Sequence, residues 1–170
     1  IGSYDIDFPS NFILIGTMNP SDFAGTEKLS EVFLDRFDII YMSYPESLEI
    51  EKQIVLTKGN KLKEIEFPEK LLNLTINFIR TLRDNDDLER VPSVRVSLGL
   101  YERSQSNALI AKRKKVSIED IKESIFSVLA HRIKLKPSVK YLIKPDEFVK
   151  KELLKFLETK SGDYLWQTAS

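Results

Sequence analysis

One short apolar segment limits what this chain can fold into. Residues 12–15 are Phe-Ile-Leu-Ile, and the run ends at once in a polar stretch that closes with Asn19 and Pro20. A continuous apolar run bounded by turn residues predicts a buried strand over residues 12–17. Proline prevents that strand from continuing. Asn19 would then lie just past the carboxyl end of a strand, which is where open α/β sheets bind ligands.

The rest of the chain predicts one more strand and then helices. Residues 39–43 form a second short apolar run, after a short helix from about Ser30 that turns Val32 and Phe33 inward. Beyond a boundary at Tyr44 and Pro45, proline and serine starts combined with three-four apolar spacing predict helices. They cover residues 46–58, residues 68–82, a long segment from Ser93, a segment from Ser117 and a last one from Pro145 to Ser161. The expected fold class is α+β, mostly α.

Two of these helices carry expectations about which face is buried. In the helix over residues 46–58 the apolar pair is Ile50 and Ile54. In the long helix from Ser93, the expected buried stripe consists of Val94, Leu98, Tyr101, Ala108 and Leu109, while Gly99 weakens the helix locally. The helix that begins at Ser117 has a capping-box-like start, because Asp120 stands three residues later.

Composition excludes several classes of function. The 170 residues are 42% apolar and 31% charged, which is typical of a globular protein. No apolar run approaches the roughly 18 residues that span a bilayer, so no membrane association is expected. The chain has no cysteine and a single histidine, His131. We therefore expect no disulfide, no cysteine nucleophile and no metal site, and a cytoplasmic location. The balanced net charge argues against nucleic acid as a partner.

Three residues suit the handling of phosphate, and each has a structural alternative. Asn19 could orient a water molecule through its amide, or it could simply cap the strand in an Asn-Pro turn. Arg36 could offer a planar guanidinium to phosphate oxygens, or it could pair with a neighbouring carboxylate, Asp35 or Asp38. Arg95 would lie in the first turn of a helix, where backbone amides favour an anion. Its alternative is a solvated arginine beside Glu89 or Glu102.

Several sequence blocks, taken together and in order, resemble a known family. They are Thr-Met-Asn-Pro at 17–20, Gly25-Thr26, Leu-Ser-Glu-Val-Phe-Leu-Asp-Arg-Phe at 29–37, Tyr44-Pro45 with Glu49, Ser93-Val94-Arg95, residues 116–120, and Val-Leu-Ala-His-Arg-Ile at 128–133. This pattern resembles the second half of a AAA+ ATPase module of the MoxR type, from about Tyr4 to Ile133. The earlier blocks resemble the end of its ATPase core and the later blocks its lid.

The resemblance implies roles for the three candidates and a division of the chain. Asn19 matches sensor 1 and Arg36 matches the arginine finger, so both would be catalytic. Arg95 matches sensor 2 and would bind the nucleotide, although many members have proline where Val94 stands. Residues 1–44 would be a C-terminal remnant of the AAA+ α/β core, residues 45–160 the helical lid domain, and residues 161–170 a tail. Arg132, beside His131, resembles a His-Arg pair of the family, although packing explains it equally well.

The sequence also lacks elements that such an ATPase needs. Nothing matches G-x-x-x-x-G-K-[ST], and no apolar run ends in paired carboxylates that could hold magnesium. We therefore expect a C-terminal fragment that is inactive alone and self-associates through unpaired strand edges, whereas the full-length protein would use ATP and Mg²⁺. The family implies a homo-oligomeric ring, a hexamer, that remodels a client, often with a partner bearing a von Willebrand A domain.

Two further expectations concern partners. Residues 1–51 carry ten acidic and two basic residues, whereas residues 134–160 carry eight basic and four acidic ones. This asymmetry would favour head-to-tail contact between copies, with solvated surfaces as the simpler interpretation. The basic run Lys112–Lys115 could touch nucleic acid or protein, or it could be a solvated helix end. The alternative to the ATPase interpretation is a free-standing helical protein-interaction or nucleic-acid-binding module.

Overall fold

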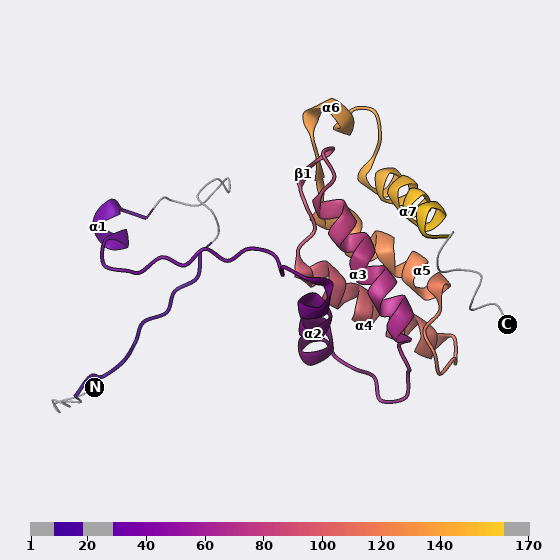
Figure 1. The fold of residues 1–170 in the computed structure, drawn as a ribbon, viewed down its shortest axis with the longest axis horizontal. Helices are drawn as coiled ribbons and strands as arrows, with labels where there is room; N and C mark the ends of the chain where they lie inside the picture. The colour runs from indigo at the N-terminus through magenta and orange to yellow at the C-terminus, as the bar shows by residue number, and fades with distance from the viewer. Residues whose placement is uncertain (1–8, 19–28, 162–170) are drawn as a thin grey trace, which may run out of the picture. The chain divides into compact units, whose positions relative to one another are not determined.

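The chain divides into two units. The computed structural model describes residues 9–18 and 29–161, shown in colour in Figure 1. Residues 1–42 form the N-terminal unit and residues 43–170 form the helical unit. The division falls close to Tyr44 and Pro45, where the sequence indicates a boundary.

The described part of the N-terminal unit contains one short helix. Helix α1 spans Glu31–Leu34, and the hydroxyl of its N-cap residue, Ser30, accepts a hydrogen bond of 3.2 Å from the backbone N–H of Phe33. Within the described residues of this unit, 9–18 and 38–42 adopt no regular structure. Val32 and Phe33, expected to turn inward, are both exposed.

The strands expected over residues 12–17 and 39–43 are therefore not formed in this chain. Their apolar side chains are open to solvent, with Ile13 88% and Ile40 81% exposed. A strand satisfies its backbone N–H and C=O groups only by pairing with a neighbouring strand. Neither segment pairs with any part of the chain that the structure describes, so the apolar run alone cannot become a strand.

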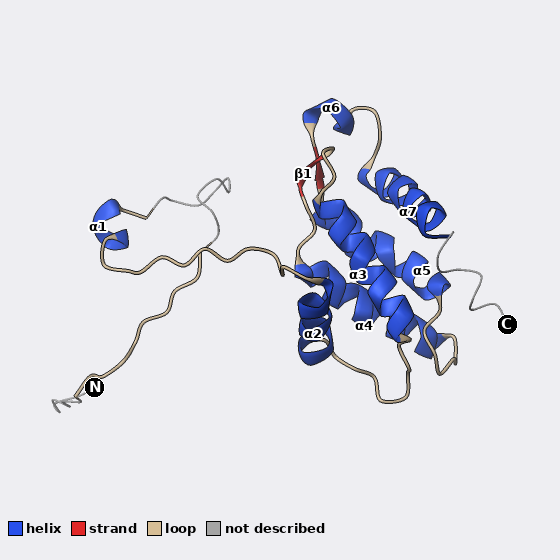
Figure 2. Cartoon of the chain, viewed as in Figure 1, coloured by secondary structure: helices blue, strands red, loops and turns tan. Residues whose placement is uncertain are grey.

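The helical unit consists of helices with one small sheet, and it confirms the mostly helical fold class (Figure 2). Its elements in order are α2 (Leu48–Lys58), α3 (Glu69–Arg83), β1 (Leu88–Arg90), α4 (Val94–Ile110), α5 (Ile118–Leu129), the 3-10 helix η1 (Ala130–Arg132), β2 (Lys134–Leu135), α6 (Pro137–Lys140) and α7 (Pro145–Ser161). Strands β1 and β2 pair antiparallel, with Leu88 opposite Leu135. Strands β1 and β2 and helix α6 were not predicted from the sequence.

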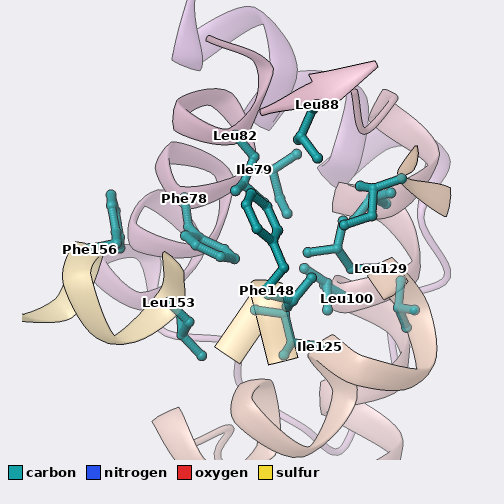
Figure 3. Close-up of a cluster of buried hydrophobic side chains, with 14 of the residues drawn as sticks. Phe78, Ile79, Leu82, Leu88, Leu100, Ile125, Leu129, Phe148, Leu153 and Phe156 are labelled. Atoms are coloured by element: carbon teal, nitrogen blue, oxygen red, sulfur yellow. The ribbon is translucent and has the colours of Figure 1, made fainter. Parts of the chain in front are cut away.

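The main hydrophobic core lies between α3, α4, α5 and α7 (Figure 3). Ile79, Leu100, Ile125 and Leu129 are completely buried in it, and Phe78 on α3 packs against Phe156 on α7 with ring centroids 5.4 Å apart. Two smaller clusters join α2 to α3 and α4, and the segment before α3 to α4 and α5. These clusters draw all their residues from the helical unit, so this unit has a complete core of its own.

Helix α4 is buried differently from the sequence expectation. Tyr101 and Ala108 are buried as expected, but Val94 and Leu98 are only half-buried and Leu109 is exposed. The buried residues of α4 are Val96, Ser97, Leu100, Tyr101, Ser104, Gln105, Asn107 and Ala108. The helix contacts α2, α3 and α5 at once, and its buried polar side chains find hydrogen-bond partners on those neighbours and in the connecting loops. A single apolar stripe cannot describe such a helix.

Within the described residues, no helix is both long enough and apolar enough to cross a lipid bilayer.

Candidate functional site

Arg95 occupies the first turn of helix α4 with its side chain exposed. Helix α4 begins at Val94 after the N-cap residue Ser93, so Arg95 is its second residue. Within the described residues Arg95 forms no hydrogen bond or ion pair. Glu89 instead pairs with Lys134, with a Glu89 Oε1–Lys134 Nζ distance of 2.6 Å. The other sequence candidate for a partner, Glu102, is also occupied, because it accepts two hydrogen bonds from Asn60. The guanidinium of Arg95 is therefore available to a ligand.

A buried carboxylate lies beneath this helix start. Glu51 on α2 is completely buried, and its two oxygens accept a pair of 2.7 Å hydrogen bonds from the guanidinium of Arg83 on α3. The hydroxyl of Ser97, in the first turns of α4, donates to Glu51 Oε1 at 2.6 Å. Arg80 Nη1 stands 3.5 Å from Glu51 Oε2. One carboxylate thus joins three helices.

The hydrogen bonds around Glu51 settle its charge. Burial raises the pKa of the Glu51 carboxyl, but the hydrogen bonds from Arg83 and Ser97 and the positive charges of Arg83 and Arg80 outweigh it, so the pKa lies below its usual value. The carboxylate is therefore ionised at neutral pH. A buried charge is tolerated only when it is paired and hydrogen-bonded, as this one is.

The same two arginines also hold the segment that enters the helical unit. Arg80 donates to the backbone carbonyls of Pro45 and Glu46 at 2.8 and 2.9 Å. Arg83 lies 4.8 Å above the ring of Tyr44, a cation–π contact. Its Nε also donates to the carbonyl of Pro92, two residues before α4, at 2.9 Å. A shallow hollow of about 220 Å³ is lined by Tyr44, Pro45, Arg80, Arg83 and Asp84.

The apolar spacing of α2 did not predict this network, because it indicated a different buried face. Ile50, expected to be buried, is 44% exposed, and Ile54 is half-buried. The buried residues of α2 are Glu51 and Val55. The spacing contains a signal, because Glu51 stands four residues before Val55 and so shares its face. A carboxylate on an apolar face predicts a buried partner, and two arginines occur in α3.

Helix α5 meets α4 one turn beyond Arg95. A side-chain carbon added at Gly99 would lie 2.8 Å from a methyl carbon of Val128, so glycine permits the two helices to approach this closely. Arg132 donates to the carbonyl of Val128 at 2.5 Å, which caps the end of α5. The carbonyl of His131 accepts a hydrogen bond from Arg90 at 3.1 Å. The side chain of Arg132 therefore caps α5, and the backbone of His131 links η1 to β1.

Two residues of the basic run after α4 form internal ion pairs, Arg113 with Asp120 and Lys115 with Glu66. Lys112 has a positive φ of 56°, and the N–H groups of Lys112 and Arg113 bond back to the carbonyls of Leu109 and Ala108, which is a Schellman motif. Arg113 forms a two-pronged ion pair with the buried carboxylate of Asp120. Burial raises the pKa of Asp120, but the bonds from Arg113 and Ser117 more than offset this and hold it below its usual value.

Arg36 and Asn19 complete the set of sequence candidates. Arg36 follows α1, is exposed, and donates to the carbonyl of Val32, one helical turn back. No ion pair joins it to Asp35 or Asp38 within the described residues, so the surface-pair alternative is not realised there. Asn19 lies outside the described residues. Arg36 belongs to the N-terminal unit and Arg95 to the helical unit.

The described side chains suit anion binding better than acid–base chemistry. Within residues 9–18 and 29–161, no three side chains of the kinds that ligate metals come together. The candidate groups are guanidiniums, and that of Arg95, at the start of α4, forms no hydrogen bond or ion pair within the described residues. A guanidinium in this position recognises the oxygens of a phosphate or carboxylate, and the backbone N–H groups of the first helical turn add to that preference.

Part of the helical unit is similar to a known protein family. Residues 90–152 match the family model of the AAA lid domain, and this match includes all of α4 and α5. The uncharacterized protein YeaC of Bacillus subtilis (strain 168) is 24% identical over 162 residues, which cover 83% of this chain and 51% of YeaC.

A solved structure resembles the chain as well. It is the crystal structure of a "putative ATPase" from Cytophaga hutchinsonii ATCC 33406, with a TM-score of 0.50 and 22% identity over 81% of this chain. At that identity the likeness shows a shared fold. The chain spans about half the length of both proteins, 51% in each case.

Proposed function

We propose, from the AAA lid domain over residues 90–152, that this chain is the sensor and lid part of a AAA+ ATPase of the MoxR type. The observation that carries the proposal is the state of Arg95. It stands in the first turn of a lid helix, exposed and without an internal partner within the described residues, while Ser97 of the same helix donates a hydrogen bond to the buried carboxylate of Glu51. A free guanidinium on a well-anchored helix start suits the binding of a nucleotide phosphate.

In this proposal each sequence candidate has a separate role. Asn19 orients the attacking water against the terminal phosphate of ATP. Arg36 reaches the nucleotide of a neighbouring subunit and neutralises charge that develops in the transition state. Arg95 contacts the nucleotide of its own subunit and moves with the lid. One observation supports the roles of both arginines: within the described residues, neither Arg36 nor Arg95 forms an ion pair with a carboxylate.

The remaining parts of the nucleotide site would come from elsewhere in a longer protein. The 170 residues hold no G-x-x-x-x-G-K-[ST] loop to cradle phosphates. In this proposal that loop and the carboxylates that hold Mg²⁺ lie in another part of a longer protein. The match covers 51% of YeaC, so the rest of YeaC is the part that would correspond to it. The chain alone would then bind ATP weakly and would not hydrolyse it.

The proposal extends to assembly. A finger that acts on a neighbouring subunit requires a closed ring, and we propose a hexamer in the cytoplasm that remodels a client protein, with a von Willebrand A domain protein as a candidate partner. The opposite charge balance of residues 1–51 and 134–160 favours contact between unlike surfaces of adjacent copies. Oligomerisation that depends on added ATP would support this part of the proposal.

The decisive experiment compares two arginines of helix α4 in the full-length protein. Arg95→Ala removes the proposed phosphate contact. Arg103→Ala is the matched control, because Arg103 is also exposed on α4, two turns further along. A charge-assisted hydrogen bond to phosphate contributes about 1.5–3 kcal/mol, so Arg95→Ala should weaken binding of a fluorescent ATP analogue about 10- to 100-fold. Arg103→Ala should leave binding within about twofold.

Two outcomes would contradict the proposal. Equal affinities in the Arg95→Ala and Arg103→Ala proteins would remove Arg95 from the nucleotide site. A full-length protein that binds no ATP would overturn the ATPase assignment altogether and favour the alternative, a helical protein-interaction module.

A further inference from the structure

The two contacts that fix the start of helix α4 meet on one carboxylate. The carbonyl of Pro92, just before the helix, is held by Arg83 at 2.9 Å, and Arg83 is held by Glu51. The hydroxyl of Ser97, just after Arg95, is held by Glu51 directly at 2.6 Å. Arg95 lies between these two fixed points with its own side chain exposed. The backbone that carries Arg95 is therefore anchored on both sides through Glu51.

The segment that enters the helical unit is anchored to the same carboxylate. Arg80 holds the carbonyls of Pro45 and Glu46, and Arg83 covers the ring of Tyr44. Both guanidiniums face Glu51, at 3.5 Å and 2.7 Å. Residues 44–46 and the first turn of α4 are far apart in sequence but are joined by two side chains on α3 and one on α2.

We propose that Glu51 is a positioning residue that fixes Arg95 relative to the entering segment Tyr44–Glu46. The inference rests on the proposed function, in which Arg95 contacts the nucleotide. Any displacement of residues 44–46 is passed through Arg80 and Arg83 to Glu51, and from there to both ends of the turn that carries Arg95.

The charge of Glu51 suits a rigid connection. Its two oxygens accept three hydrogen bonds from Arg83 and Ser97 and face a second arginine, so rotating the carboxylate would break several contacts at once. Charge-assisted, two-pronged pairs are the most geometrically specific hydrogen bonds that side chains form. A rigid connection of this kind makes a displacement of one end move the other end as well.

The first test measures geometry in the 170-residue chain without any nucleotide. The chain has no cysteine, so Glu46→Cys and Arg103→Cys place one spin label at the entering segment and one on α4, both at exposed sites. Pulsed electron paramagnetic resonance then gives the distribution of distances between the labels. With Glu51 present we expect one narrow distribution. With Glu51→Gln we expect a distribution at least twice as wide.

Two further variants make this test decisive. Glu49→Gln is the matched control, because Glu49 is an exposed carboxylate on the same helix that pairs with Lys52 at 2.8 Å, and it should leave the distribution unchanged. If Glu51→Gln lowers the helix content, Ser97→Ala replaces it, because this change removes the direct hydrogen bond between α4 and Glu51 and retains the Glu51–Arg83 pair. An unchanged distribution in the folded variant would overturn the proposal.

The second test asks whether Glu51 acts through Arg95 in the full-length protein. Glu51→Gln should weaken binding of the fluorescent ATP analogue about fivefold or more. Added to Arg95→Ala, it should cause no further loss, because the residue that it positions is already absent. Additive losses would overturn the positioning role while leaving the ATPase proposal intact. If Arg95→Ala has no effect, the nucleotide role of Arg95 fails, and the distance measurement still decides whether Glu51 fixes the geometry.

Discussion

The two units of this chain hold similar apolar residues in opposite states. In the N-terminal unit, Phe12, Ile13 and Ile40 are mostly exposed. In the helical unit, Ile79 and Ile125 are completely buried. The difference follows from how each kind of element satisfies its backbone. A helix forms its hydrogen bonds within itself and needs only a face to pack against, whereas a strand needs another strand. The helical unit contains what it needs, and the described N-terminal segments do not.

The largest expected effect comes from replacing Arg36 of the N-terminal unit, and it differs in kind from the effect of replacing Arg95 of the helical unit. In the full-length protein, Arg36→Ala should lower the ATP turnover rate about 1000-fold or more, because an arginine that neutralises transition-state charge contributes at least this much. Nucleotide affinity should change little, in contrast to Arg95→Ala. Steady-state turnover and analogue binding, measured on both variants, check this. Restored turnover on mixing Arg36→Ala subunits with subunits that lack the phosphate-binding loop would show that Arg36 acts across the interface, whereas an unchanged rate in Arg36→Ala itself would refute the role.

The second effect tests the difference in burial directly. Ile125→Ala should lower the free energy of unfolding of the 170-residue chain by about 3 kcal/mol, because it leaves a cavity in the core between α3, α4, α5 and α7. Ile13→Ala, the matched control, should change it by less than about 0.5 kcal/mol. Urea unfolding followed by circular dichroism measures both. Comparable losses at the two positions would mean that the N-terminal apolar run is packed in solution.

The third effect concerns pH. Glu51 and Asp120 have pKa values below their usual ones in the folded state, so their contribution to stability is complete above the unfolded values of about 4. It is lost as the pH falls through the folded values, because the unfolded chain then binds more protons than the folded one. We expect thermal midpoints that are flat from pH 7 to about 5 and that fall towards pH 2.

Two substitutions test whether this pH dependence comes from the buried carboxylates of the helical unit. Asp120→Asn should lower the midpoint at pH 7 and flatten its fall below pH 4. Asp38→Asn, at an exposed carboxylate of the N-terminal unit, should leave the profile unchanged. A profile that Asp38→Asn flattens equally would show that the acid sensitivity is not specific to the buried carboxylates.

The smallest effect refines the description of helix ends in the helical unit. Lys112 adopts a left-handed conformation at the end of α4, where glycine carries no steric cost. Lys112→Gly should therefore raise the free energy of unfolding by about 0.5 kcal/mol. Lys114→Gly, at an exposed position without a positive φ, should lower it slightly. Urea midpoints compare the two, and a loss of stability in Lys112→Gly would contradict the expectation.

Much of the helical unit can be predicted from local signals. The helices expected from Ser117 and from Pro145 are present as α5 and α7, and the reciprocal contact between Ser117 and Asp120 at the start of α5 is confirmed. Local spacing and capping chemistry decide these features. Strands β1 and β2 are three and two residues long, too short for an alternating pattern, so their pairing could not be anticipated.

The candidate site was only partly predictable for a different reason. Arg95 was correctly expected in the first turn of its helix, because Pro92 and Ser93 mark that start. The role of Glu51 was missed, since a carboxylate early in a helix is ordinarily a solvated residue that favours the helix dipole. Its partners Arg83 and Ser97 come from elements 32 and 46 residues away. Only the tertiary arrangement brings such residues together.

Gly99 has no side chain, yet the close approach of α5 that it permits also affects the position of Arg95. Its bare Cα lets a methyl group of Val128 enter the space that any other residue would fill. A methyl group at position 99 would act as a wedge between α4 and α5, one turn from Arg95, and would tilt the arginine without replacing it. We expect a substitution at this position to give a folded protein in which Arg95 no longer supports nucleotide binding.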